Sequence, residues 1–102
     1  MRQRVNVIDS VIEGNTAGLD GGGVYGSGET ITGSLIEGNT AGLDGGGVYV
    51  SFQATLADST VTNNTATTGG GVFAAVVGNV TLNGTNNLCG NTPDDWPSCI
   101  SG

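Results

Sequence analysis

Residues 12–25 read IEGNTAGLDGGGVY, and this stretch decides the fold because it occurs twice. The same fourteen letters return at residues 36–49, 24 positions later, and a diverged copy, VTNNTATTGGGVF, occupies residues 61–73. An internal period of about 20–50 residues is typical of proteins built from stacked, equivalent units. The repeat therefore predicts a solenoid, in which each unit packs against its neighbours along the chain.

The repeated unit extends backwards from each copy. Residues 7–10, 31–34, 56–59 and 82–85 align in the same frame, so the unit spans about 24 residues. Each unit contains three short runs of alternating apolar and polar residues, centred on Val7, Ile12 and Val24 in the first unit. Such alternation, broken by Gly and Asn, indicates strands and turns, and no run has helical periodicity.

These runs predict an all-β fold: a short right-handed parallel β-helix, a three-sided solenoid with about 24 residues per coil and three to four coils. We expect coils near residues 5–28, 29–53, 54–79 and 80–92. A disordered leader is expected at residues 1–4 and a C-terminal cap at residues 93–102, where Pro93, Trp96 and Pro97 interrupt the repeat.

Stacking in register predicts columns of equivalent residues along the solenoid. Two apolar columns should fill the interior. A column of asparagines should hydrogen-bond along the stack and turn the chain through a left-handed backbone conformation. The Gly triplets that precede the third run should allow a positive φ or a close backbone approach. The interior columns comprise Ile12, Ile36, Val61 and Leu88, and Val24, Val48 and Val72; the asparagines are Asn15, Asn39, Asn64 and Asn91.

The charge balance argues against several partners. Only Arg2 and Arg4 are basic, against nine acidic residues, and the net charge is −7. We expect no nucleic-acid partner, because phosphate binding needs clustered Lys and Arg. No apolar run approaches the ~18 residues of a membrane-spanning helix, so membrane insertion is not expected either.

Two cysteines, Cys89 and Cys99, lie near the C-terminus. The chain has no His and no CxxC spacing, which argues against zinc. A disulfide that closes this short loop fits better and would stabilise the fold by about 2–3 kcal/mol. A disulfide implies an oxidising compartment, so we expect an extracellular or cell-surface protein whose signal peptide is not in this chain.

The segments GGGVY and GGGVF, together with IEGN, VTNN and LCGN, resemble the GGA[ILV] and FxxN repeats of polymorphic outer membrane proteins. They are also similar to the wider group of bacterial right-handed parallel β-helix repeat proteins. The resemblance covers nearly the whole chain, from about Val5 to Thr92. It implies a surface-exposed or secreted adhesin or passenger domain, usually much longer than this chain.

A catalytic site is not expected. Enzymes with this fold that cleave acidic polysaccharides use clustered Asp with a Lys or Arg base, whereas this chain has no Lys and no His. No bound cofactor is expected. The weak metal candidates are acids that should stack one coil apart, and Ca²⁺ bound to their oxygens would relieve the repulsion. These candidates are Glu13 with Glu37 and Asp20 with Asp44.

Two outward columns could form a binding face. Tyr25, Tyr49 and Phe73 follow the inward valines and should stack outside the solenoid, either as a ladder covered by the loops after it, at 26–29 and 50–53, or as a surface for carbohydrate or protein. Uncharged columns flank Val7, Ile31, Leu56 and Leu82 and resemble the ice-binding faces of some antifreeze proteins. Their threonines are Thr30, Thr32, Thr55 and Thr81.

The first coil has no cap, so its apolar end should be open. We expect self-association through that coil, or a chain that is a fragment of a longer protein. The functional interpretation is a non-catalytic secreted or cell-surface module with a structural or adhesive role. The alternative is an ice-binding or calcium-stabilised binding module.

Overall fold

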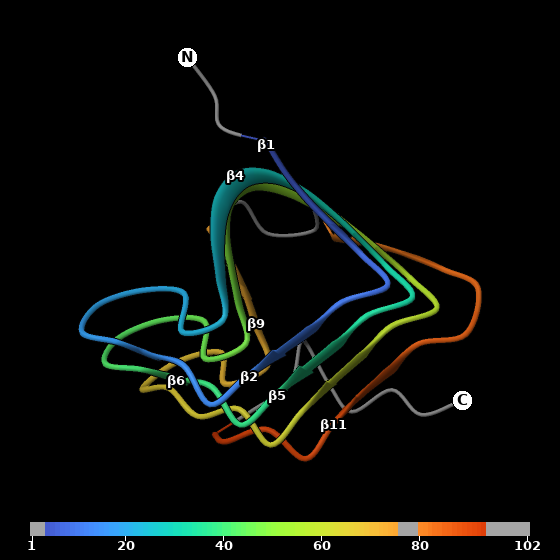
Figure 1. Ribbon diagram of the computed structural model, residues 1–102. Coiled ribbons are helices and arrows are strands. Elements are labelled where there is room, and N and C mark those ends of the chain that lie inside the picture. Colours follow the sequence, from blue (N-terminus) through green and yellow to red (C-terminus); the bar gives the residue numbers. More distant parts are fainter. Residues whose placement is uncertain (1–3, 76–79, 94–102) are drawn as a thin grey trace.

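The computed structural model of the chain describes residues 4–75 and 80–93. Within these residues every regular element is a β-strand, and every strand pair is parallel. The chain winds into a triangle, with successive turns stacked behind one another (Figure 1). Seen from the N-terminal end the chain runs clockwise as it recedes, so the solenoid is right-handed (Figure 1). The predicted fold class is confirmed.

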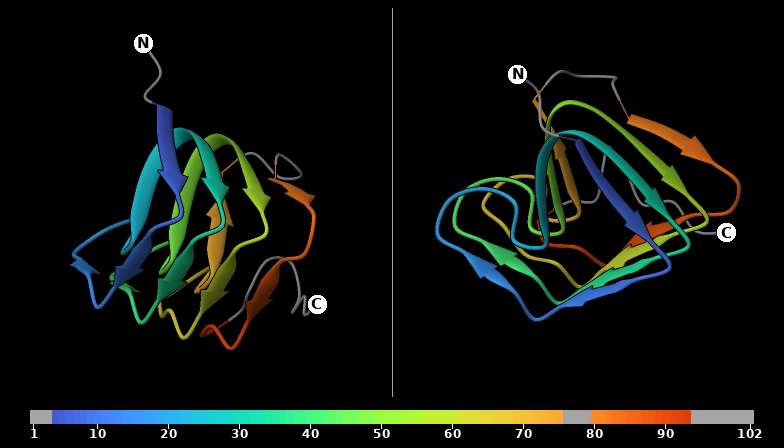
Figure 2. Two further views of the ribbon diagram at one scale, coloured as in Figure 1. Left: turned by 45° about the vertical axis from the view of Figure 1, so that its right-hand side comes forward. Right: turned by 45° about the horizontal axis from the view of Figure 1, so that its top comes forward.

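The strands of successive coils lie side by side in three sheets (Figure 2). The largest is the five-stranded sheet, the second has four strands and the third has two. The five-stranded sheet comprises β1 (Arg4–Ile8), β4 (Val24–Thr32), β7 (Val48–Ala57), β10 (Val80–Asn83) and β9 (Val72–Ala74); the four-stranded sheet β2 (Val11–Glu13), β5 (Leu35–Glu37), β8 (Thr60–Thr62) and β11 (Asn87–Cys89); the third sheet β3 (Thr16–Ala17) and β6 (Thr40–Ala41).

The predicted apolar columns form the core. Ile36 pairs with Ile12 on one side and Val61 on the other, and Val48 lies between Val24 and Val72. The side chains of Ile36, Val48 and Val61 are 0% exposed. Burying an aliphatic side chain of this size stabilises a protein by about 1.5–3 kcal/mol, so these columns are the main source of stability.

The predicted asparagine ladder is also present. The Oδ1 of Asn39 accepts hydrogen bonds from the backbone N–H and the Nδ2 of Asn15, at 3.0 and 3.1 Å. The same pair of bonds joins Asn39 to Asn64, and Asn64 to Asn91. Each buried amide therefore bridges two coils, and hydrogen bonding of this kind lets polar side chains occupy the interior.

The left-handed turn does not lie at the ladder asparagines, and that prediction was wrong. The positive φ angles belong to the residues directly before them. The ladder residues must point inward to reach one another, so the preceding residue makes the turn, and it is usually glycine. These turn residues are Gly14 (φ 66°), Gly38 (φ 66°), Asn63 (φ 54°) and Gly90 (φ 74°).

The strands β4 and β7 each continue around a corner of the triangle. We expected a strand, a loop and a second strand here, with the loops at 26–29 and 50–53, and this was wrong. Both segments belong to continuous strands, nine and ten residues long. The two strands stay paired through the corner apart from one register shift, between Gly26 and Gly28, where β7 has an additional residue. Continuous pairing keeps the backbone satisfied without a loop.

The last coil also contains one additional residue. The sequence alignment placed Thr85 in line with Ser59, but Asn86 takes that position. The N–H of Ser59 donates to Oδ1 of Asn86 at 3.0 Å, as the N–H of Ser34 donates to Oγ of Ser59 at 3.1 Å. This second buried polar ladder explains why serine recurs at that position of the repeat.

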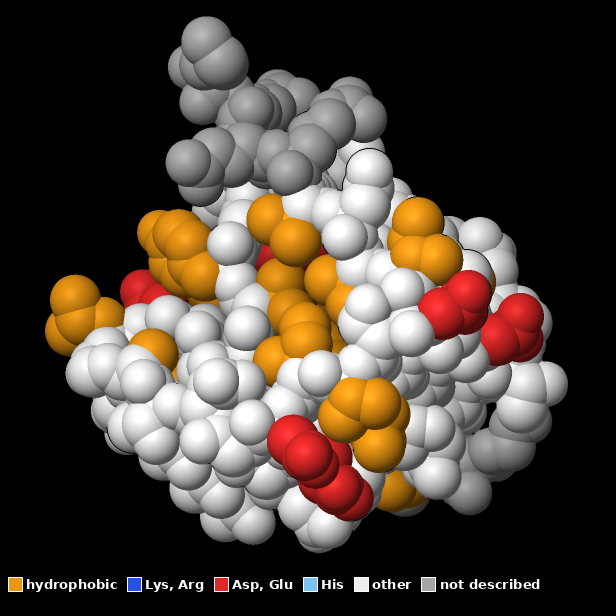
Figure 3. Space-filling model, viewed as in Figure 1, with side chains coloured by type: hydrophobic (Ala, Val, Ile, Leu, Met, Phe, Trp, Pro, Cys, Tyr) orange, Lys and Arg blue, Asp and Glu red, His pale blue; other side chains and the backbone are white. Residues whose placement is uncertain are grey.

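The N-terminal coil leaves the core open at one end. Figure 3 shows apolar side chains gathered in the middle of this face, inside a rim of polar groups. Val5 and Ile12 are partly exposed, whereas Leu88 in the last coil is fully buried. β1 begins at Arg4, inside the expected leader, whose residues 1–3 lie outside the described part. The expected cap also lies outside it, apart from Pro93.

Candidate functional site

The three aromatic residues of the repeat stack on the outside of the solenoid. The rings of Tyr25 and Tyr49 lie 5.0 Å apart and are inclined by 7°. Those of Tyr49 and Phe73 lie 5.5 Å apart and are inclined by 9°. Register dictates this arrangement, because the residue before each ring is an inward-facing valine of one interior column. The predicted stack is present, and we call it the aromatic ladder.

The aromatic ladder is exposed at its N-terminal end, where Tyr25 is 56% accessible. The loops that precede β4 and β7 expose Leu19 and Leu43, and the N–H of Leu43 donates to the carbonyl of Leu19 at 2.8 Å. Each loop turns back towards its ring, because the backbone at Gly21 lies against Tyr25. Aromatic and aliphatic groups are therefore presented together on one side of the molecule.

Acids border the aromatic ladder. The N–H of Asp44 donates to Oδ1 of Asp20 at 3.2 Å, so these two residues stack as predicted. Burial raises the pKa of the Tyr49 hydroxyl above its usual value, and the carboxylates of Asp20 and Asp44 raise it further. The ladder is thus an apolar surface in a negative local field.

The second acidic pair, Glu13 and Glu37, lies in register at the ends of β2 and β5. It belongs to the four-stranded sheet, whereas Asp20 and Asp44 lie in the loops before β4 and β7. In the described part of the chain no three Asp, Glu, Cys or His residues come together as a metal site. Calcium binding at these acids stays a prediction.

The threonines predicted as a flat face lie in register on the outer side of the five-stranded sheet. Thr30 pairs with Thr55, Thr55 pairs with Thr81, and Asn6 extends the column to β1. Thr32 lies one column further along, between Ile8 and Ala57. Ice binding by this face stays a prediction.

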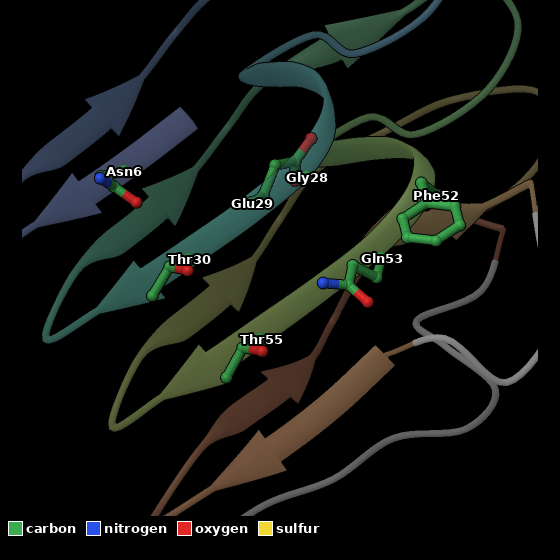
Figure 4. Close-up of a pocket in the computed structure, with 7 residues that line it drawn as sticks. All are labelled: Asn6, Gly28, Glu29, Thr30, Phe52, Gln53 and Thr55. Carbon is green, nitrogen blue, oxygen red and sulfur yellow. The ribbon is translucent and has the colours of Figure 1, made fainter. Parts of the chain in front are cut away.

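A cavity of about 70 Å³ lies beside this column, at the corner where β4 and β7 bend (Figure 4). We call it the Gln53 cavity. The sequence analysis named two of its threonines but did not predict the cavity. The additional residue in β7 has no counterpart in β4, so the alignment of the repeats did not show which residues would lie side by side here. It is lined by Asn6, Gly28, Glu29, Thr30, Phe52, Gln53 and Thr55.

Glu29 was also missed. Its side chain is 4% exposed, and neither carboxylate oxygen has a hydrogen-bond partner among the described residues. Desolvation raises its pKa from 4.5 to about 8. Glu29 pairs in register with Val5 and Ala54, both interior positions. Alternation could have revealed it, because it lies two residues before the inward Ile31.

Cys89 ends β11 and is partly buried. Its expected partner, Cys99, lies outside the described residues, so the pairing stays a prediction.

Among the described residues no helix is long and apolar enough to cross a membrane.

The first coil matches a known family. Residues 9–27 fit the family model of the Chlamydia polymorphic membrane protein repeat. This coil is similar to a polymorphic membrane protein repeat. The match includes Ile12 and Asn15 of the interior columns and Tyr25 of the aromatic ladder, so the predicted resemblance is confirmed on the residues that build the coil. The family description names a membrane protein. No curated protein and no solved structure gives a significant match.

Proposed function

We propose that this chain is a non-catalytic module of a surface protein and that it adheres to a protein partner through the aromatic ladder. The observation that carries the proposal is the stack of Tyr25, Tyr49 and Phe73 on the outside of the solenoid. Large exposed apolar side chains that gather on one face are typical of interaction sites. Tyrosines are suited to such contacts because a flat ring and a hydroxyl bind at low entropic cost.

The solenoid supplies rigidity for this surface. Each ring is anchored by the buried valine beside it and by backbone hydrogen bonds to the neighbouring coils. Gly23, Gly47 and Gly71 lead into the three strands, and the N–H of Val24 donates to the carbonyl of Gly47 at 2.9 Å. A preorganised surface loses little conformational entropy on binding, which favours affinity.

The charge around the aromatic ladder selects the partner. Asp20 and Asp44 border the ladder, and the whole chain has a net charge of −7. A partner with an apolar centre and a basic rim would complement this surface and approach it faster at low ionic strength. A non-catalytic role agrees with the absence of Lys and His from the sequence.

Adhesion can be measured with beads coated with the purified chain and applied to cultured epithelial cells. We expect the double variant Tyr25→Ala/Tyr49→Ala to lose most of the adhesion. The control is Ile8→Ala, which removes an equally exposed apolar side chain from another face. Melting curves of all three proteins establish that they fold. Equal adhesion of the double variant and the control would contradict the proposal.

Surface location has its own test. An antibody against the loop at residues 18–23 should label intact bacterial cells that produce the protein. Labelling that appears only after the cells are permeabilised would contradict a surface role.

A further inference from the structure

The Gln53 cavity lies where two otherwise identical coils differ. The first two copies of the repeat share fourteen residues, and the segments that follow them diverge: GSGET at 26–30 and VSFQAT at 50–55. The second segment is one residue longer, which produces the register shift beside Gly28. Bulges of this kind commonly redirect side chains next to binding sites. Here the divergence introduces Phe52 and Gln53.

The cavity exists because one position of the sheet has no side chain. Gln53 pairs with Gly28 in the neighbouring strand, so nothing fills the space on the outer face beside the Gln53 side chain. The column of Asn6, Thr30 and Thr55 forms the other wall (Figure 4). Neighbouring strands lie about 4.8 Å apart, so these polar groups form a regular row.

The polar groups of the cavity are available to a ligand. In residues 4–75 and 80–93 no hydrogen bond engages the side chains of Thr30, Thr55 or Gln53, nor that of Asn6. Hydroxyl and amide groups both donate and accept hydrogen bonds. Together they match a ligand that presents hydroxyl groups in several directions.

The described side chains of the cavity present no charge to such a ligand. Glu29 is the acidic residue in the lining, and its carboxylate faces the solenoid interior, where Oε2 lies near Gly26. The partly exposed Phe52 contributes an apolar wall. A volume of about 70 Å³ holds on the order of two to five water molecules, which is room for a hydroxymethyl group or one edge of a sugar ring.

We propose that the Gln53 cavity binds one residue of a neutral carbohydrate. The ring edge or hydroxymethyl group enters the cavity, its hydroxyls exchange hydrogen bonds with Thr30, Thr55 and Gln53, and its apolar C–H face packs against Phe52. This site is distinct from the aromatic ladder and does not depend on it.

The test is a titration of the isotope-labelled chain with neutral methyl glycosides of glucose, galactose and N-acetylglucosamine, followed by amide NMR. We expect at least one of them to shift the signals of Thr30, Gln53 and Thr55 saturably, with a millimolar dissociation constant. Thr30→Val and Thr55→Val keep the shape of the side chain and remove the hydroxyl. Each should weaken binding about five- to tenfold, the contribution of one hydrogen bond.

The control is Thr81→Val, which changes the next threonine of the same column outside the cavity. It should bind like the unmodified chain, and so should Tyr25→Ala, which affects only the aromatic ladder. The proposal is overturned if no neutral glycoside shifts these signals at tens of millimolar. It is also overturned if Thr55→Val and Thr81→Val weaken binding equally, or if the anionic methyl glucuronide binds as tightly as the neutral sugars.

Discussion

The side-chain oxygen of Asn64 accepts two hydrogen bonds from Asn39 of the preceding coil, from its backbone N–H at 2.9 Å and from its Nδ2 at 3.0 Å. The Nδ2 of Asn64 donates in turn to the carbonyl of Ile36 at 3.1 Å and to Oδ1 of Asn91 at 2.9 Å. Asn39 and Asn64 are 0% exposed. One buried amide therefore bonds to the coils on both sides of its own and links three coils.

Replacing Asn64 should be strongly destabilising. Asn64→Leu leaves the buried N–H of Asn39 without its acceptor, removes one of the two acceptors of Asn39 Nδ2, and removes a donor to the carbonyl of Ile36. Each unsatisfied buried group costs about 1–3 kcal/mol, so we expect a loss of about 3–5 kcal/mol in the free energy of unfolding. Urea denaturation measures it. The control, Asn15→Leu, changes the exposed end of the same ladder and should cost less than about 1 kcal/mol. Similar losses in both variants would show that the ladder does not stabilise the fold.

The middle glycine of the second triplet is predicted to be irreplaceable. A Cβ at Gly46 would lie 2.5 Å from the carbonyl oxygens of Gly70 and Thr65, which are themselves fixed by coil-to-coil hydrogen bonds. Gly46→Ala should therefore lose about 3 kcal/mol or more, since the backbone of the next coil must move.

Gly18→Ala is the matched control for Gly46→Ala. A Cβ at Gly18 would meet nothing within 4 Å, and its φ is not positive. This variant should keep its stability or gain up to about 1 kcal/mol, because alanine restricts the unfolded chain. Thermal melting of both proteins gives the comparison. A Gly46→Ala midpoint at or above that of Gly18→Ala would contradict the close stacking of the coils.

Glu29 should make stability fall as the pH rises. Its pKa is about 8 in the folded chain, against an ordinary value of 4.5, so between these values the folded state holds a proton that the unfolded state has lost. The stabilising effect of that proton is complete below about pH 4.5 and is lost as the pH passes through 8. The gap between the two pKa values corresponds to a loss on the order of 5 kcal/mol.

The pH dependence can be assigned with Glu29→Gln, which cannot ionise. Urea unfolding at a series of pH values from 4.5 to 8 should show a smaller decrease for this variant than for the unmodified chain. Glu13→Gln removes an exposed carboxylate and should keep the original pH dependence. If Glu29→Gln and the unmodified chain lose stability in parallel, the interior carboxyl is not responsible.

The open N-terminal coil should pair with the same coil of a second molecule. The partly exposed Val5 and Ile12 would be covered, and a two-fold axis would join two identical surfaces. Light scattering should then show a mass that rises with concentration. Ile12→Lys puts a charge at the inward face of β2 and should keep the chain monomeric. Val11→Lys adds the same charge on the outward face of that strand and should still associate. A monomer at every concentration would exclude this pairing.

Much of the fold follows from the sequence, because coils that stack in register bring residues 24 positions apart into contact. Ile36 lies beside Ile12, and Tyr49 beside Tyr25, because identical sequences fold into coils of the same shape and equivalent residues then stack. The inward or outward direction of each residue followed from strand alternation. The sequence alone therefore predicted that the interior columns are apolar and that an aromatic column lies outside.

Other features depend on how the coils adjust to one another. Three features depend on backbone hydrogen bonds between coils. They are the φ of each turn residue, the continuation of β4 around a corner and the placement of Asn86 in the column of serines. An inserted residue changes these hydrogen bonds locally. The periodic pattern of the sequence does not show at which position the strand pairing changes.

The sequence by itself determined the repeat, the interior columns and the aromatic ladder, because each follows from counting along the chain. Only the tertiary structure decided the Gln53 cavity and the burial of Glu29. The cavity needs the extra residue of β7 to bring Gln53 against Gly28, and Glu29 is desolvated by residues of two neighbouring coils. Both result from the register between neighbouring coils, and this register cannot be predicted from the spacing of residues within one coil.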